Sequence, residues 1–125
     1  MARRSLIALA VVATAGGAAA ATPENFDFDQ AGDLIALCSV QPGQPYYEAA
    51  IHSCHAYGLG AWHYYLASTS GSPAHAFVCV PEPRPGVARV AEDFAAWGRA
   101  RPALHADPAV EVLFKFLTET YPCRR

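Results

Sequence analysis

The sequence predicts an all-α fold, a compact single domain of approximately four helices that is cross-linked by two disulfide bonds. Apolar residues recur at helical spacing in four separate segments of the 125-residue chain. Clusters of proline and glycine separate these segments and mark helix ends. The third observation is the even number of cysteines, four, in a small chain that begins like an exported protein.

The first predicted helix covers residues 28–39. Its apolar positions follow the i, i+3, i+4, i+7 pattern: Ala31, Leu34, Ile35 and Cys38. The turn-forming cluster at 41–45, which reads Gln-Pro-Gly-Gln-Pro, ends this helix. The second predicted helix begins near Tyr46, because Pro45 suits a first helical turn.

The second predicted helix is apolar on two faces. One long stripe joins seven residues: Tyr47, Ala50, Ile51, Cys54, Tyr57, Ala61 and Tyr65. A second stripe lies on another face: His55, Leu59, Trp62 and Leu66. A helix of this kind is either central to the fold or shared with a partner. Gly58 and Gly60 each cost about 1 kcal/mol in helix propensity, so we expect them to allow close packing between helices.

A loop and an extended run separate this helix from the next. Residues 68–74 form a polar loop rich in serine and glycine, and residues 75–80 form a short strand or an extended run. Three prolines then exclude regular structure as far as Gly86: Pro81, Pro83 and Pro85.

Two further helices complete the predicted domain. The third covers residues 87–99, and four residues form its inner face: Val87, Val90, Phe94 and Trp97. The fourth begins with Asp107 as N-cap and Pro108 at the first helical position. Its core stripe contains five residues: Val110, Leu113, Phe114, Leu117 and Tyr121.

The N-terminus has the pattern of a secretory signal peptide, which we assign to residues 1–21. Arg3 and Arg4 precede an apolar run, and small residues at 16–21 offer cleavage sites. This run is short for a membrane span, and no later segment approaches about 18 uninterrupted apolar residues. We therefore expect an exported, periplasmic domain of residues 22–125 with no membrane span after cleavage.

This expected domain is mildly acidic. It carries seven lysine or arginine side chains against eleven aspartate or glutamate side chains, a net charge of −4. A surface of this sign repels phosphate backbones, so we expect no nucleic-acid partner.

The four cysteines predict two disulfide bonds with three open connectivities. The short loop between the first two helices makes them antiparallel neighbours, so Cys38 can meet Cys54. Cys79 and Cys123 then join the extended run to the end of the last helix. We favour the pairs Cys38–Cys54 and Cys79–Cys123. The cysteines lack CxxC spacing, and we expect no metal and no cofactor.

Nothing in the sequence points to a catalytic site, and we expect no enzymatic activity. His52 and His55 lie one helical turn apart, but His63 lies about 80° further round the helix, and no carboxylate shares their face. The serines lack the strand-to-helix context of a nucleophile elbow.

The aromatic residues of the second helix are the remaining indication of a functional surface. Tyrosine and tryptophan are enriched at protein interfaces, and Tyr47, Trp62 and Tyr65 form our candidate dimer surface. Two interpretations stay open here: a core role alone, or a core role combined with a homodimer interface.

Four short motifs link the chain to a known family: Leu34-x-x-Leu37-Cys38, Cys54-x-x-Tyr57-x-x-Gly60, Cys79-Val80-Pro81 followed by Gly86-Val87, and Tyr121-Pro122-Cys123. In this order, over about residues 31–123, they resemble the Rap/Tai group of bacterial periplasmic immunity proteins, which protect against type VI secretion amidase effectors. The resemblance implies a small helical fold, disulfides, frequent dimerisation and no enzymatic activity. It also implies that the protein plugs the cleft of a peptidoglycan amidase.

Two functions follow as hypotheses. The first is a periplasmic protein-binding module that blocks an amidase effector, with the loop after the second helix reaching the partner. The residues assigned to that contact are Ser70, Gly71, Ser72 and His75. The alternative is a structural or stress-related cell-envelope protein that self-associates through its aromatic helix without a toxin partner.

Overall fold

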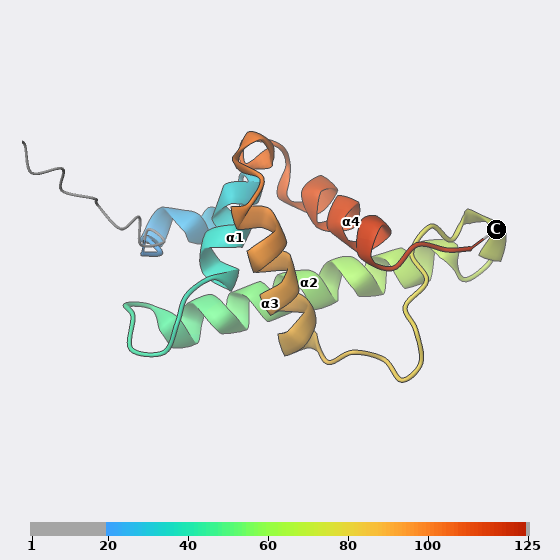
Figure 1. Cartoon of the computed structure of the whole chain (residues 1–125), viewed down its shortest axis with the longest axis horizontal. Coiled ribbons are helices and arrows are strands. Elements are labelled where there is room, and N and C mark those ends of the chain that lie inside the picture. The colour runs from blue at the N-terminus through green and yellow to red at the C-terminus, as the bar shows by residue number, and fades with distance from the viewer. Residues whose placement is uncertain (1–19, 125) are drawn as a thin grey trace, which may run out of the picture.

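The computed structural model describes residues 20–124, which fold into four α-helices and three short 3-10 helices (Figure 1). The α-helices are α1 (Ala31–Cys38), α2 (Tyr47–Thr69), α3 (Val87–Arg99) and α4 (Ala109–Thr120). The 3-10 helices are η1 (Pro23–Asp27), η2 (Pro73–His75) and η3 (Pro102–Leu104). Over residues 20–124, strand pairing is limited to one isolated antiparallel bridge between Val78 and Pro122. The predicted all-α fold with four helices is confirmed, whereas residues 1–19 of the predicted signal peptide lie outside the described part.

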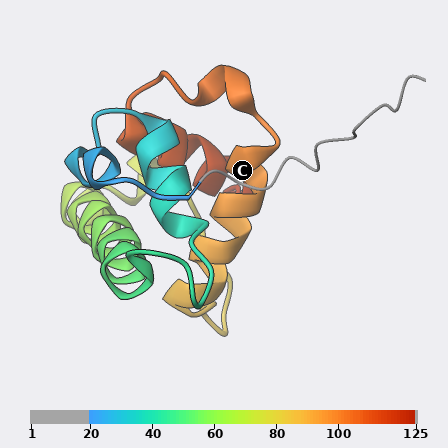
Figure 2. The ribbon, with the colours of Figure 1, turned by 90° about the vertical axis from the view of Figure 1, so that its left-hand side faces the viewer.

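The helices surround the short helix α1. It lies between α2 and α3 (Figure 2) and also contacts α4. The long helix α2 runs along one side of the molecule, and its C-terminal half extends past α3 toward the end where the chain terminates (Figure 1). This extension places the segment after α2 beside the C-terminus.

The hydrophobic core lies where α1 meets α3 and α4. The largest fully buried side chains come from these three helices: Leu34, Leu37, Phe94, Val112 and Phe116. The rings of Phe94 and Phe116 meet edge to face, with their centroids 5.5 Å apart. Burying a leucine or phenylalanine side chain contributes about 1.5–3 kcal/mol. Helix α1 has only eight residues, so this burial stabilises it more than its helix propensity does.

The first two predicted helices begin later than expected because of left-handed residues before them. Phe28 has φ 54°, so α1 begins at Ala31 and not at residue 28. The backbone N–H of Gln30 donates to the Asp33 carboxylate at 3.0 Å and fixes this start. Tyr46 has φ 64°, so α2 begins one residue after it.

Two other predicted boundaries are wrong by one or two residues. Asp107 is not the N-cap of α4, because Pro108 takes that position with ψ 135° and the helix begins at Ala109. The backbone carbonyl of Asp107 instead accepts a hydrogen bond from Ala31 N–H at 2.8 Å, which ties the start of α1 to the start of α4. Helix α2 continues to Thr69, so the polar loop begins at residue 70 and not at 68.

The predicted role of the two glycines in α2 is also wrong. A Cβ atom added at Gly58 or Gly60 would meet no atom within 4 Å, so neither residue permits a close approach of helices. That role belongs to Gly98 in α3, where an added Cβ would lie 2.6 Å from the Cγ1 and Cδ1 atoms of Ile35. The backbone of α3 therefore packs directly against a side chain of α1.

Both predicted disulfide bonds are confirmed. Cys38 bonds to Cys54, with their Cα atoms 5.2 Å apart, and joins the end of α1 to α2. Cys79 bonds to Cys123, with their Cα atoms 4.8 Å apart, and joins the segment after α2 to the residues after α4. The two bonds close 16 and 44 residues of sequence.

Candidate partner-binding surface

Residues 70–78, which we call the anchored loop, connect α2 to the second disulfide. The loop projects at the far end of α2, next to the C-terminus (Figure 1). Ser70, Gly71 and His75 are exposed, and Ser72 is half-buried. The structure therefore brings the four predicted contact residues together on one loop. Their contact with a partner stays a prediction.

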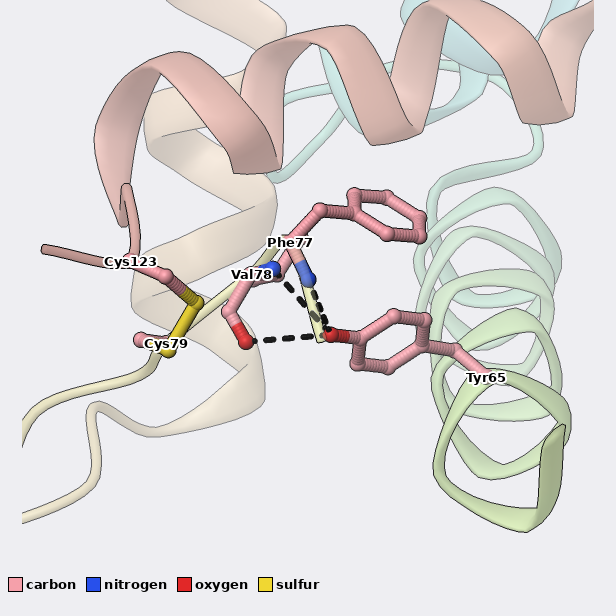
Figure 3. Close-up of a disulfide and its surroundings, with 5 residues drawn as sticks. All are labelled: Tyr65, Phe77, Val78, Cys79 and Cys123. Atoms are coloured by element: carbon pink, nitrogen blue, oxygen red, sulfur yellow. Dashed lines mark hydrogen bonds between the residues drawn. A yellow bond between two sulfur atoms is a disulfide. The ribbon is translucent and has the colours of Figure 1, made fainter. Parts of the chain in front are cut away.

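The hydroxyl of Tyr65 holds the base of the anchored loop (Figure 3). It accepts hydrogen bonds from the backbone N–H groups of Phe77 and Val78, both at 3.1 Å, and donates one to the Val78 carbonyl at 3.2 Å. Tyr65 and Val78 are both buried. One side chain of α2 thus satisfies three backbone groups that have no helix or sheet to pair with.

The second disulfide fixes the same base from the other side (Figure 3). Beside it, the Cys79 N–H donates to the Tyr121 carbonyl at 2.8 Å, and Val78 forms its bridge with Pro122. The base of the anchored loop is therefore held by a covalent bond and by backbone hydrogen bonds. Its tip, residues 70–75, is left as the accessible part.

Replacing Tyr65 with phenylalanine should lower the free energy of unfolding by about 1–3 kcal/mol, because buried backbone groups of Val78 lose their hydrogen bonds. Urea denaturation followed by circular dichroism measures this change. The matched control is Tyr64→Phe, since the Tyr64 side chain is 77% exposed, and its effect should stay within about 0.5 kcal/mol. Equal stabilities of the two variants would show that the hydroxyl of Tyr65 does not hold the loop.

A second surface feature, which we call the apolar groove, opens between α2, α3, α4 and the proline-rich segment 80–87. Its cavity volume is about 180 Å³. The floor is made of core side chains, among them Leu34, Phe94 and Leu113, together with the Cys38–Cys54 disulfide. Leu59 and Val87, which are 41% and 37% exposed, line the groove from opposite sides. The groove therefore connects the surface to the hydrophobic core.

Four polar side chains line the groove: Arg84, His55, His63 and Tyr121. Arg84 is exposed, His63 is exposed and His55 is half-buried. Burial raises the pKa of the Tyr121 phenol, with a further contribution from the Asp93 charge, so this hydroxyl stays protonated at neutral pH. Among the described residues, no aspartate or glutamate lines the groove.

The three residues of the candidate dimer surface do not form one patch. Tyr65 is buried against Phe77 and Phe114, so its inclusion in an accessible surface is wrong. Tyr47 and Trp62 are half-buried, pack against the core and lie 15 positions apart, which is about 22 Å along a helix. Homodimer formation itself stays a prediction.

The arrangement of the described side chains suits binding. All four cysteines are disulfide-bonded. Within residues 20–124, no three histidine, cysteine, aspartate or glutamate side chains lie close enough together to hold a metal ion. The polar tip of the anchored loop and the apolar groove are two features that a partner can reach.

Across the same described stretch, no helix is both long enough and apolar enough to cross a membrane.

The apolar groove was not predicted from the sequence, although one sequence pattern on α2 indicated it. His55, Leu59 and Trp62 belong to the second stripe of α2, and all three line the groove. The stripe indicated that a second face of α2 was either buried or shared. The groove is also lined by Val80, Arg84 and Val87 of the segment 80–87. This segment is rich in proline, and its sequence does not show which helix it packs against.

Comparison with known proteins identifies the family. A model of the family described as Rap1a immunity proteins matches residues 30–123, which include all four helices and both disulfides. No curated protein and no solved structure matches the chain. Because the match covers well over half of the sequence and agrees with the order of the cysteine motifs, this chain belongs to the Rap1a immunity protein family.

Proposed function

We propose that this protein is a periplasmic immunity protein that binds a peptidoglycan amidase effector of a type VI secretion system and blocks its active-site cleft. The match to the Rap1a immunity family over residues 30–123 carries this proposal. Immunity proteins act by binding, and we propose no catalytic activity for this chain. The amidase as target follows from the resemblance of the cysteine motifs to the Rap/Tai group.

The two disulfide bonds support a location outside the cytosol, because cross-links of this kind persist in oxidising compartments. We therefore propose that the N-terminal segment is a signal peptide that is removed on export. Ala21 is only 5% exposed and belongs to the hydrophobic core. A cleavage site that leaves Ala21 on the mature chain fits this packing better than our predicted boundary after residue 21.

The anchored loop is our candidate for the segment that enters the amidase cleft. Its base is fixed by Tyr65 and by the Cys79–Cys123 bond, so little conformational entropy remains to be lost there on binding. Its tip carries small polar residues, which follow the shape of a cleft more easily than bulky ones. The predicted contact residues Ser70, Gly71, Ser72 and His75 all lie in this tip.

The wild-type chain should abolish hydrolysis of purified peptidoglycan by its cognate amidase effector when the two proteins are mixed in equal amounts. Gly71→Glu should weaken this inhibition at least tenfold, about 1.4 kcal/mol of binding free energy, because it places a charge at the loop tip. The matched control is Gly60→Glu on the exposed side of α2. Both glycines have open space around them, so neither substitution meets a steric clash.

Two outcomes of this assay would contradict the proposal in different ways. If the wild-type chain left the amidase fully active, the amidase target would be wrong. If the wild-type chain inhibited the amidase but Gly71→Glu and Gly60→Glu inhibited it equally well, the effector would be bound without the tip of the anchored loop.

A further inference from the structure

We infer that the apolar groove is a second contact site for the effector, and that it receives one apolar side chain of about phenylalanine size that stands next to an acidic residue. This inference rests on the proposed function, because it names the chemistry of the partner that the immunity protein binds. The anchored loop plays no part in it. The groove is lined by α2, α3, α4 and the segment 80–87, whereas the loop follows the end of α2.

The size of the groove limits its occupant to one side chain. Apolar cavities of about 150 Å³ stay free of water and bind a single benzene ring. The groove has a volume of about 180 Å³ and a floor of leucine, phenylalanine and disulfide sulfur. It is open to solvent, so a group can enter without unfolding the domain. A whole helix or a long acyl chain exceeds this volume, whereas one aromatic or leucine side chain fills it.

The charges around the groove indicate what stands next to that side chain. Arg84 lines the groove, and no acidic side chain among the described residues does so. The charge that lines the groove is therefore opposite in sign to the net charge of the chain. A carboxylate beside the inserted side chain would meet the guanidinium of Arg84, and charge-assisted hydrogen bonds of this kind favour specific recognition.

The segment 26–29 of a second copy of this chain is a poorer occupant. The segment 26–29 reads Phe-Asp-Phe-Asp and has the required chemistry, but both of its aromatic rings are already engaged. Phe28 stacks on Tyr57 with ring centroids 4.9 Å apart, and Phe26 packs against the hydrophobic core. If either ring were inserted into the groove of a neighbouring molecule, the part of the donor chain's core that the ring covers would become exposed to solvent.

A substitution at Gly58 can fill the groove with a side chain of the protein itself. It lines the groove, and an added Cβ meets no atom within 4 Å, so a leucine side chain at this position enters open space. Gly60 also has open space around it, but it lies about 160° away on the other side of the helix. Gly58→Leu and Gly60→Leu raise helix propensity equally, so they form a matched pair that differs only in the face altered.

The first arm of the test uses 3-phenylpropionate, a phenyl ring that carries a carboxylate, and needs no effector. Added to the full domain, it should shift the NMR amide signals of Leu59, Val87 and Ala91 with a Kd of about 1 mM. Gly58→Leu should abolish these shifts, and Gly60→Leu should retain them. Arg84→Gln should weaken binding of 3-phenylpropionate about threefold and leave the uncharged 3-phenylpropan-1-ol unaffected.

The second arm measures the Kd of the amidase effector for the same variants. Gly58→Leu should weaken binding at least tenfold relative to Gly60→Leu. If the wild-type chain does not bind the amidase, the proposed function fails, and the phenylpropionate titration still decides whether the groove accepts this chemistry. The inference is overturned if 3-phenylpropionate shifts no groove amide, or if the amidase binds both leucine variants equally.

Self-association is the remaining outcome, and sedimentation velocity of the wild type and both variants detects it. A wild-type dimer that Gly58→Leu converts to a monomer, while Gly60→Leu does not, would assign the groove to a second copy of the chain and overturn the effector contact.

Discussion

Replacing Cys79 and Cys123 together with serine is expected to lower the free energy of unfolding by about 4 kcal/mol. The bond closes 44 residues of sequence, and the loop-entropy model gives about this value for a closure of that length. It also holds the base of the anchored loop, so the variant should lose inhibition of the amidase as well. Urea denaturation under non-reducing conditions measures the stability, and the peptidoglycan hydrolysis assay measures the inhibition.

The other disulfide supplies the control for this experiment. Cys38–Cys54 closes only 16 residues, so its removal should cost about 3 kcal/mol. It forms part of the floor of the apolar groove, our second proposed contact site, so this variant serves as a control for stability and not for inhibition. If both double variants were as stable as the wild type, the cross-links would contribute nothing to the fold.

Phe94→Ala is expected to destabilise the domain by about 3–5 kcal/mol, because it removes a buried ring and leaves a cavity. Phe94 is 2% exposed and packs on Phe116 and Trp97, with ring centroids 5.5 and 6.5 Å away. The matched control is Phe77→Ala, which makes the same substitution at a side chain that is 45% exposed and should cost about 1–2 kcal/mol. Thermal and urea denaturation measure both variants. A Phe94→Ala domain as stable as the Phe77→Ala domain would contradict the placement of the core.

The secondary structure and the Cys38–Cys54 bond could be predicted from the sequence because they depend on local patterns, and Cys79–Cys123 was then the remaining pair. The apolar spacing of the helices is visible within each segment, and the turn cluster at 41–45 fixes α1 and α2 as neighbours, which brings Cys38 and Cys54 together. The errors at the starts of α1 and α2 arose where a single residue, Phe28 or Tyr46, takes a left-handed conformation. Non-glycine residues rarely do so, and no pattern signals it.

The features that depend on tertiary packing could not be predicted in this way. Gly58 and Gly98 look alike in the sequence, since each is a glycine within a helix. Only the fold shows that Gly98 faces Ile35 while Gly58 faces open space. Tyr65 likewise reads as an interface residue, and its buried hydroxyl becomes apparent only when residues 77 and 78 fold back over α2.

The two disulfide bonds also determine when the domain becomes stably folded. A domain of this size has a net stability of only about 5–15 kcal/mol, and the two bonds together account for about 7 kcal/mol on the loop-entropy model. A chain whose thiols are still reduced is therefore only marginally folded. Oxidation of the four thiols completes the stable structure, so the fold is complete only in a compartment that supports disulfide formation.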